Sequence, residues 1–236
     1  MINPFWSNTR AYESAYIITV KNHEKSERHS LECQESCDKA GMKWKIWDAY
    51  DGTKESKMIV PEHSSNSDFM KMLKITDHYL TRGEVACALS HISLWVHCVN
   101  LDQPIIILEH DAIVVKNVEM HESYNSIVYL GGVEWAERNW PVMSVPPHAS
   151  EGPNYHFICR AHAYGIDPQV AKNLLAHVLK YGIVAPLDIM IRTDIFHVTH
   201  QGLIAYDKNY DKTNDTTIKA RPLEGRSTIR NDNLEI

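Results

Sequence analysis

Pro104-Ile-Ile-Ile-Leu-Glu109-His110-Asp111-Ala-Ile-Val-Val115 is the stretch of sequence that decides the fold of this chain. Four aliphatic residues follow the proline with no polar residue between them, a pattern typical of a short strand that is buried on both faces. The run then meets two acids and an imidazole, which an apolar core does not accommodate cheaply unless they are paired. We therefore predict that the strand reaches the surface at Glu109, at its carboxyl end, where open α/β sheets bind their ligands.

Glu109 and Asp111 lie two residues apart, so that in an extended chain both side chains point to the same side. Carboxylate oxygens at this spacing suit a hard divalent cation, Mg²⁺ or Mn²⁺, with water and phosphate as the remaining ligands. A charged surface turn that follows a core strand explains the same residues. The pattern by itself leaves both interpretations open.

The composition favours a folded protein with a core of useful size. The chain has 236 residues, enough for one large domain or for one domain with a tail. Hydrophobic residues make up 44% and charged residues 23%, as in ordinary globular domains. The formal net charge of −6 argues against a general nucleic-acid-binding surface, which would need an excess of basic residues.

Two further features concern the compartment. The first eight residues have neither the basic nor the apolar segment of a signal peptide, and no apolar run approaches the roughly 20 residues of a membrane helix. We therefore expect no signal peptide, no transmembrane segment and a cytoplasmic location. The five cysteines are odd in number and form no CxxC pair, which favours reduced, mostly buried thiols over a disulfide framework.

The first third of the chain has the pattern of a βαβ unit. A strand is expected over 16–20, then a helix over 24–40 that ends at Gly41, and a second strand over 44–47. The turn that follows contains Asp48 and Asp51. Residues 53–80 are polar and mixed, and we expect a mobile excursion there that could lie over the site.

A second helix is marked by a capping box in which Thr81 is the N-cap and Glu84 is the third helical residue. The apolar face of this helix runs from Ala88 to Val99 and leads directly into the 104–115 strand. His91 lies on or near that face. A core histidine with its nitrogens satisfied is at least as good an interpretation as a catalytic one.

The rest of the chain alternates strands and helices, and ends in a segment where apolar residues become sparse. We expect a single domain over 1–206 and a loosely packed polar tail over 207–236. The helix after Asp167 begins with an acid at the N-cap and Pro168 at the first helical position. The other expected elements are strands over 127–130, 157–166, 195–200 and 203–206, a long loop over 133–155, and a short helix from Pro186.

Several motifs occur in a fixed order. They are Ile17-Ile18 followed by Ser26-Glu27-Arg28, Ala49-Tyr-Asp51-Gly52, Gly83-Glu84-Val-Ala-Cys87-Ala-Leu-Ser90-His91, Glu109-His110-Asp111-Ala112, Ala163-Tyr164 before a helix with Ala171 to Leu175, and Pro186-Leu-Asp188. In these motifs the chain resembles the family 25 glycosyltransferases, which include bacterial lipooligosaccharide galactosyltransferases and the collagen galactosyltransferases. The resemblance covers most of residues 15–192, and the shared order and spacing of the motifs make it specific.

The resemblance implies a GT-A fold, an α/β fold with a Rossmann-like, mostly parallel sheet flanked by helices. It also implies a metal-dependent inverting glycosyltransferase of the kind used in lipopolysaccharide biosynthesis. Such an enzyme would move a hexose, galactose or glucose, from a UDP-sugar to a glycan, a lipid-linked saccharide or another hydroxyl acceptor.

Roles for individual residues follow from the same resemblance. Mn²⁺ or Mg²⁺ would be held by Glu109 and Asp111, with His200 or else His197 as a later ligand, and Asp188 would be the catalytic base. The donor-binding candidates are Arg28, Asp48, Asp51, Glu84, Ser90, His91 and His110. Ordinary roles compete with several of these: a surface arginine for Arg28, a simple turn for Asp48 and Asp51, and a helix cap for Glu84 and Asp188.

The chain departs from the family pattern in two places. His110 replaces the middle acid of the acidic triplet, which removes one carboxylate, and the first loop contains Lys21-Asn-His23 in place of a more Arg-rich motif. A second hypothesis is therefore a degenerate member that binds a nucleotide-sugar or glycan without turnover. A metal hydrolase, a third hypothesis, has no HExxH motif to support it.

Overall fold

The computed structural model of the chain describes residues 10–53, 58–65, 67–76, 80–121, 125–132, 143–144, 158 and 161–208. Within these ranges the structure is built on an eight-stranded mixed sheet with the order β3-β2-β4-β9-β7-β10-β5, and β8 also pairs with β10. The strands are β2 (Ala15–Thr19), β3 (Trp44–Asp48), β4 (Ile105–Glu109), β5 (Ala112–Val114), β7 (Ile127–Gly132), β8 (Met143–Ser144), β9 (Ala163–Ile166) and β10 (Val198–Asp207).

The sheet is mostly parallel in the sense that β2, β3, β4, β7 and β10 run in one direction. Strands β5, β8 and β9 run in the other. A second, two-stranded sheet pairs β1 (Arg10–Ala11) with β6 (Met120–His121). The helices are α1 (Glu24–Ala40), α2 (Glu62–Ser65), α3 (Asp68–Met72), α4 (Arg82–Leu101), α5 (Pro168–Tyr181) and α6 (Leu187–Met190).

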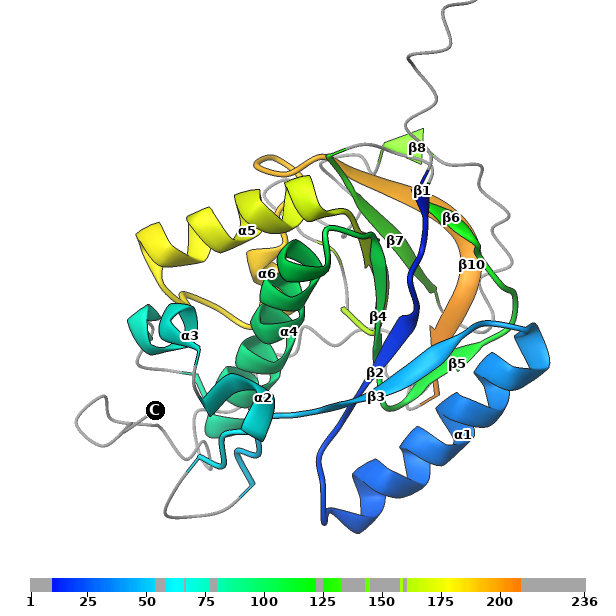
Figure 1. Cartoon of the computed structure of the whole chain (residues 1–236), viewed down its shortest axis with the longest axis horizontal. Coiled ribbons are helices and arrows are strands. Elements are labelled where there is room, and N and C mark those ends of the chain that lie inside the picture. Colours follow the sequence, from blue (N-terminus) through cyan, green and yellow to red (C-terminus); the bar gives the residue numbers. More distant parts are fainter. Residues whose placement is uncertain are drawn as a thin grey trace, which may run out of the picture.

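Helices cover both faces of the large sheet (Figure 1). The larger core lies between the sheet and α4, α5 and α6, and includes the buried Trp95 and Tyr164. The smaller core lies on the opposite face under α1, where Cys33 and Cys37 pack against β2 and β4. The predicted fold class, an α/β fold with a Rossmann-like sheet flanked by helices, is therefore confirmed, and the GT-A fold is the form of it that the resemblance implied.

The predicted central strand is confirmed as β4. Residues 105–108 are at most 1% exposed because β4 is paired on both edges, with β2 and β9, and covered on both faces. The strand ends at Glu109, the chain turns at His110 and Asp111, and β5 then pairs with β10 and not with β4. The acidic segment therefore lies at the carboxyl end of the most buried strand.

The predicted helix boundaries depend on capping, and the caps are present. Gly41 ends α1 with a left-handed φ of 70°, a conformation that costs glycine little. Thr81 and Glu84 form the reciprocal capping box of α4, and the Asp167 side chain accepts from the backbone N–H of Val170 at the start of α5. The βαβ unit predicted for β2, α1 and β3 is confirmed, since β2 and β3 are parallel.

Other boundaries differ from the expectations. The two short strands predicted over 195–200 and 203–206 form the single strand β10, which has a register shift between His200 and Ala205. The polar segment 53–80 contains α2 and α3. The long loop predicted over 133–155 lies outside the described residues apart from β8, and so does the tail from 209 onward. Lys208, just past β10, forms an ion pair with Glu32 of α1.

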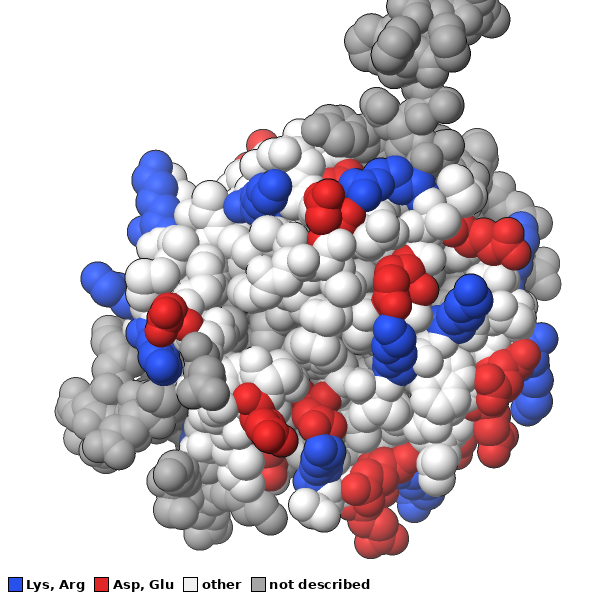
Figure 2. Space-filling model, viewed as in Figure 1, with Lys and Arg blue, Asp and Glu red and all other residues white. Residues whose placement is uncertain are grey.

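Two surface properties bear on partners. None of the helices in the described ranges has the length and apolar character needed to span a bilayer. On the face shown in Figure 2, acidic and basic side chains are interspersed, so this face presents no broad basic field.

The four cysteines in the described part of the chain are free thiols, of which three are buried.

Candidate functional site

The carboxylate of Glu109 is held by side chains from α4. Nε2 of His91 lies 3.4 Å from Oε1 of Glu109, and the Cys87 thiol donates to the same oxygen over 3.7 Å. His91 is fully buried, and its Nδ1 lies 2.8 Å from the hydroxyl of Tyr164, which also accepts from the indole N–H of Trp95 over 3.0 Å. A chain of buried polar groups thus connects the core to the exposed end of β4.

The side chains around Glu109 favour the ionised form of its carboxyl group. Burial alone would raise the pKa of the Glu109 carboxyl, but the hydrogen bond and electrostatic influence of His91, with His162 and His110, lower that pKa below its usual value. The Glu109 side chain is 29% exposed. A negatively charged oxygen is therefore fixed at the surface by neighbours that favour its charged form.

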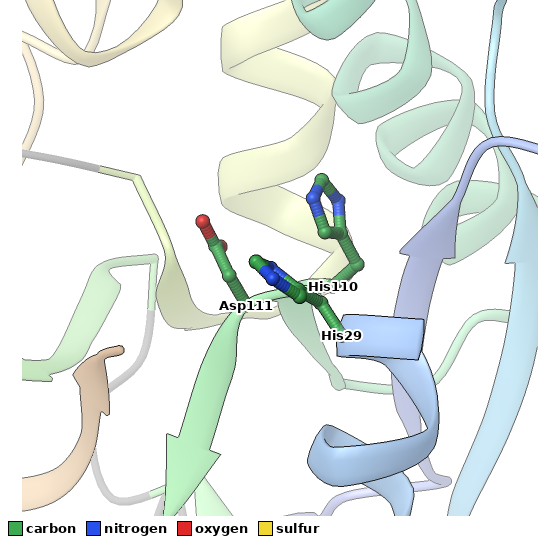
Figure 3. Close-up of side chains that lie close together, drawn as sticks. All are labelled: His29, His110 and Asp111. Atoms are coloured by element: carbon green, nitrogen blue, oxygen red, sulfur yellow. The ribbon is translucent and has the colours of Figure 1, made fainter. Parts of the chain in front are cut away.

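Asp111 belongs to a different group of side chains. His29 reaches from α1 toward the turn that carries His110 and Asp111 (Figure 3). One ligand atom from each of these three residues lies within 4.8 Å of the others. His29 is buried and His110 and Asp111 are half-buried, with 5.8 Å between the centroids of the two imidazole rings.

The expectation that Glu109 and Asp111 point to the same side required an extended chain through Asp111. The chain turns at His110 instead, so Glu109 lies against α4 and Asp111 lies against α1. The two acids nevertheless share an electrostatic environment: burial raises the pKa of the Cys87 thiol and both acids raise it further, while burial lowers the pKa of His162 and both acids partly oppose this. Imidazole and carboxylate groups in this arrangement fit a divalent cation.

Asp188, on α6, also acts electrostatically on the Cys87 thiol. Burial raises the pKa of the Cys87 thiol, and Glu109, Asp188 and Asp111 raise it further. The alternative of a helix cap is wrong for Asp188, since Pro186 is the N-cap of α6 and no side chain caps that helix. The Asp188 carboxylate is half-exposed and accepts from the backbone N–H of Ile189. It is therefore an accessible base beside the strand end.

The turn after β3 is fastened to α4. The Ser90 hydroxyl accepts from the backbone N–H of Tyr50 over 2.9 Å and donates to the carbonyl of Ala86. A Cβ on Gly52 would lie only 2.4 Å from the carbonyl oxygen of Arg82, so the turn approaches the start of α4 more closely than any other residue permits. Ser90 on α4 thus helps to position the turn that follows β3.

The acids of this turn have partners within the protein. Asp48, at the end of β3, forms an ion pair with Lys21, which follows β2. The Asp51 carboxylate is buried and accepts from the backbone N–H and the hydroxyl of Thr53. The turn interpretation explains Asp51 fully, whereas Asp48 and Lys21 form a half-exposed charged pair at the carboxyl ends of two parallel strands.

The remaining predicted residues are spread over the fold. Nε2 of His200 on β10 lies 3.1 Å from the carbonyl oxygen of Gly131, and its ring lies against Tyr129. His197 is exposed just before β10, and Arg28 is exposed on α1. Glu84 accepts from the backbone N–H and hydroxyl of Thr81, so the capping role is confirmed.

His29 is the site residue that sequence reasoning missed. It lies 81 positions from His110, and the only specific signal used for its helix was the C-cap at Gly41. The available signal was its place on the buried stripe of α1, four residues before Cys33. Tyr164 and His162 on or beside β9 were likewise not assigned roles, because only the sheet register brings them to Glu109.

A family model for glycosyltransferase family 25, described as an LPS biosynthesis protein, matches residues 13–146. The match covers more than half of the chain and contains the α4 motif, the end of β4 and the turn after β3. The chain belongs to glycosyltransferase family 25. Glu109, His110 and Asp111 of this family 25 member lie within the matched residues.

Comparison with individual proteins adds little for this family 25 chain. No curated protein sequence matches it. Among solved structures, it is similar to the galactosyltransferase LgtC in complex with donor and acceptor sugar analogues. That similarity has a TM-score of 0.44 and 8% sequence identity, over 79% of this chain and 72% of the other.

Proposed function

We propose that this family 25 glycosyltransferase is a metal-dependent, inverting enzyme that moves a hexose, galactose or glucose, from a UDP-sugar to a hydroxyl acceptor. The observation that carries the proposal is that Glu109, at the end of β4, and Asp111, in the turn after it, each lie in a group of side chains that could hold a metal ion. Glu109, Asp111 and Asp188 come from a strand end, a turn and a helix, and all three act electrostatically on the same thiol of Cys87. A glycan or a lipid-linked saccharide is the acceptor class that fits the family's description, and a cytoplasmic location belongs to the same proposal.

The carboxylates of Glu109 and Asp111 are the proposed ligands of the divalent cation, Mn²⁺ or Mg²⁺, with His200 as the predicted third ligand. A bound cation would neutralise the charge that develops on the departing nucleoside diphosphate. The lowered pKa of Glu109 supports this role, since an ionised carboxylate is the form that binds a cation. His200 would have to release the Gly131 carbonyl or coordinate through Nδ1.

Asp188 is the proposed catalytic base. In a single displacement the acceptor hydroxyl oxygen forms a bond to the anomeric carbon while the bond from that carbon to the diphosphate oxygen breaks. The electron pair of the broken bond leaves with UDP, and the hydroxyl proton passes to the Asp188 carboxylate. The half-exposed position of Asp188 on α6 is what lets an acceptor reach it.

The donor-binding candidates fall into two groups, residues that could touch the donor and residues that position others. Asp48, Arg28 and His110 have side chains that solvent reaches, so a bound nucleotide-sugar could touch them directly. The other donor-binding candidates, Asp51, Glu84, Ser90 and His91, would act as positioning residues. His91 supports Glu109 and Ser90 supports the turn at Tyr50, and neither needs to touch the donor.

A panel of nucleotide-sugars tests the proposal. We expect release of UDP from at least one of UDP-galactose and UDP-glucose in the presence of Mn²⁺, and loss of that release with excess EDTA. The product of transfer to a saccharide acceptor should have the inverted anomeric configuration by NMR. UDP release that is unchanged by EDTA would contradict the metal dependence.

One observation favours a second function, nucleotide-sugar binding without turnover. His110 stands where relatives carry an acid, so the chain has one carboxylate fewer at the cation site. Binding of UDP-sugars by calorimetry, with no hydrolysis or transfer from any donor in the panel, would support this second function and exclude the first.

A further inference from the structure

We propose that His29, His110 and Asp111 form a cation site with two imidazoles and one carboxylate, which selects a first-row transition-metal ion of the Fe²⁺ to Zn²⁺ group over Mg²⁺. The proposal rests on the proposed function only for what the cation does, because binding itself can be measured without any sugar donor. It replaces two of the predicted ligands: His29 of α1 takes the place of His200, and His110 takes the place of Glu109, whose carboxylate remains a nearby negative charge.

The geometry of the three residues is close to that of a bound site. The ligand atoms lie within 4.8 Å of one another, whereas ligands about 2.1 Å from a common metal ion are about 3–4 Å apart. A small rotation of the half-buried His110 or Asp111 side chain covers this difference. Because α1 and the turn after β4 supply the ligands, two separate parts of the fold would be joined by the ion (Figure 3).

His29 has the features of a ligand that lacks its ion. Its residue is 6% exposed, and its Nδ1 is buried without a hydrogen-bond partner in the described part of the chain. Buried polar atoms are normally paired, and an unpaired one calls for an explanation. The hydroxyl of Ser30, the next residue on α1, is paired with that of Thr19 and does not satisfy this nitrogen.

The charges around the three residues also suit a cation. The backbone N–H of Lys208 donates to the carbonyl of Asp111 over 3.1 Å. Its ammonium group is engaged by Glu32 on the outer side of α1. Glu109 adds a further negative charge at the same strand end.

The kind of cation follows from the ligand types. Carboxylates and water favour Mg²⁺, Ca²⁺ and Mn²⁺, while imidazole nitrogen favours Fe²⁺, Co²⁺, Ni²⁺, Cu²⁺ and Zn²⁺. His110 occupies the place of an acid in the family pattern, and His29 adds a second imidazole. The departure at His110 therefore changes which metal is preferred and does not abolish the site.

The experiment is a metal titration of the full chain, with Co²⁺ as the probe. Visible absorption reports whether nitrogen ligands bind Co²⁺, and equilibrium dialysis gives its affinity and that of Mg²⁺. We expect one Co²⁺ per chain, bound at least about tenfold more tightly than Mg²⁺. His29→Gln and His110→Gln should each weaken Co²⁺ binding by about tenfold or more. His177→Gln, on the distant helix α5, should leave it unchanged.

Two further variants keep the test decisive. If His29→Gln fails to fold, as circular dichroism would show, the half-exposed His110→Gln decides the result by itself. His110→Asp restores an acid and should bring the affinities for Mg²⁺ and Co²⁺ closer together. Equal affinities for the two ions in the wild type, or Co²⁺ binding that survives in folded His29→Gln and His110→Gln, would overturn the proposal. So would Co²⁺ binding that is lost in His200→Gln alone.

Turnover, measured separately, distinguishes this inference from the proposed function. Tight Co²⁺ binding through His29 and His110 without transfer from any UDP-sugar would refute the enzyme activity and leave the metal site standing. Mg²⁺-dependent transfer that is unaffected by His29→Gln and His110→Gln would refute the metal site and leave the enzyme activity standing.

Discussion

At the scale of single residues, the site depends on how each carboxylate is supported. Glu109 is held by His91, which is held by Tyr164, which in turn accepts from Trp95. The Asp188 carboxylate lies half-exposed on the short helix α6 and accepts from the backbone N–H of Ile189. This contrast fits different tasks, since a fixed anion suits a cation and an accessible carboxylate suits proton transfer to and from a substrate.

Asp188→Asn keeps the shape of the side chain and removes its basicity. We expect kcat for transfer to fall by about 10²–10⁴, the usual contribution of a general base. The affinity for UDP, measured by calorimetry, should stay within about twofold, because the proposed base acts on the acceptor hydroxyl and not on the nucleotide. Asp102→Asn, at the left-handed C-cap of α4, is the matched control and should retain full activity. An equal loss of UDP affinity in Asp188→Asn would place this residue at the donor instead.

At the scale of elements, the close contact between the turn after β3 and the start of α4 positions one wall of the site. Gly52→Ala places a methyl carbon against the backbone carbonyl of Arg82, which cannot move without moving the helix. We expect the free energy of unfolding to fall by about 1–3 kcal/mol, as for other overpacked sites. Urea denaturation measures this change.

Gly83→Ala is the matched control for Gly52→Ala, because a Cβ at position 83 meets nothing closer than 3.9 Å. It lies within α4, where alanine has the higher helix propensity, so its effect should be neutral or stabilising by up to about 1 kcal/mol. If both variants unfold at the same urea concentration, the close approach at Gly52 is not what limits that position.

Much of this element structure follows from local sequence. The buried run of β4, the caps of α1, α4 and α5, and the βαβ unit are all local patterns, and each was predicted from residues close together in the chain. The turn at His110 was one of two interpretations left open by the sequence, because alternation along a strand cannot show where the strand ends. The meeting of His29 with Asp111 depends on how α1 packs on the sheet, which no local pattern encodes.

At the scale of the whole molecule, a buried contact between His121 and Asp167 joins the small sheet to the large one. The hydroxyl of Tyr12 lies 2.8 Å from Nδ1 of His121 on β6, and Nε2 of His121 lies 3.5 Å from the carboxylate of Asp167. Asp167 also caps α5. Tyr12 lies so close over β9 that a Cβ on Gly165 would be 2.2 Å from its hydroxyl.

This junction predicts an acid-dependent stability. Burial would raise the pKa of the Asp167 carboxyl, but His121 and the backbone N–H groups of Val170 and Asn125 lower it below its usual value. A carboxyl with a lowered folded pKa stabilises the protein above the unfolded pKa of about 3.9, and this stabilisation is lost as the pH falls through the folded pKa.

Asp167→Asn keeps a helix cap and loses the charge. We expect it to lower the free energy of unfolding at pH 7 by about 1–3 kcal/mol, since His121 remains buried without its charged partner. The difference from wild type should shrink as the pH falls below 4. Asp167→Ala should cost about 1 kcal/mol more through the lost cap. Urea denaturation at pH 7 and at acid pH measures both, and a pH-independent difference would contradict a stabilising role of the Asp167 charge.

The most direct test of the central claim, that the carboxylates after β4 serve a cation during transfer, is the rate of UDP release with and without metal in two isosteric variants. We predict that Glu109→Gln and Asp111→Asn each lower the metal-stimulated rate by about a hundredfold or more. Asp68→Asn, at the exposed start of α3, should leave that rate unchanged. Metal-stimulated release at the wild-type rate in either Glu109→Gln or Asp111→Asn would contradict the claim.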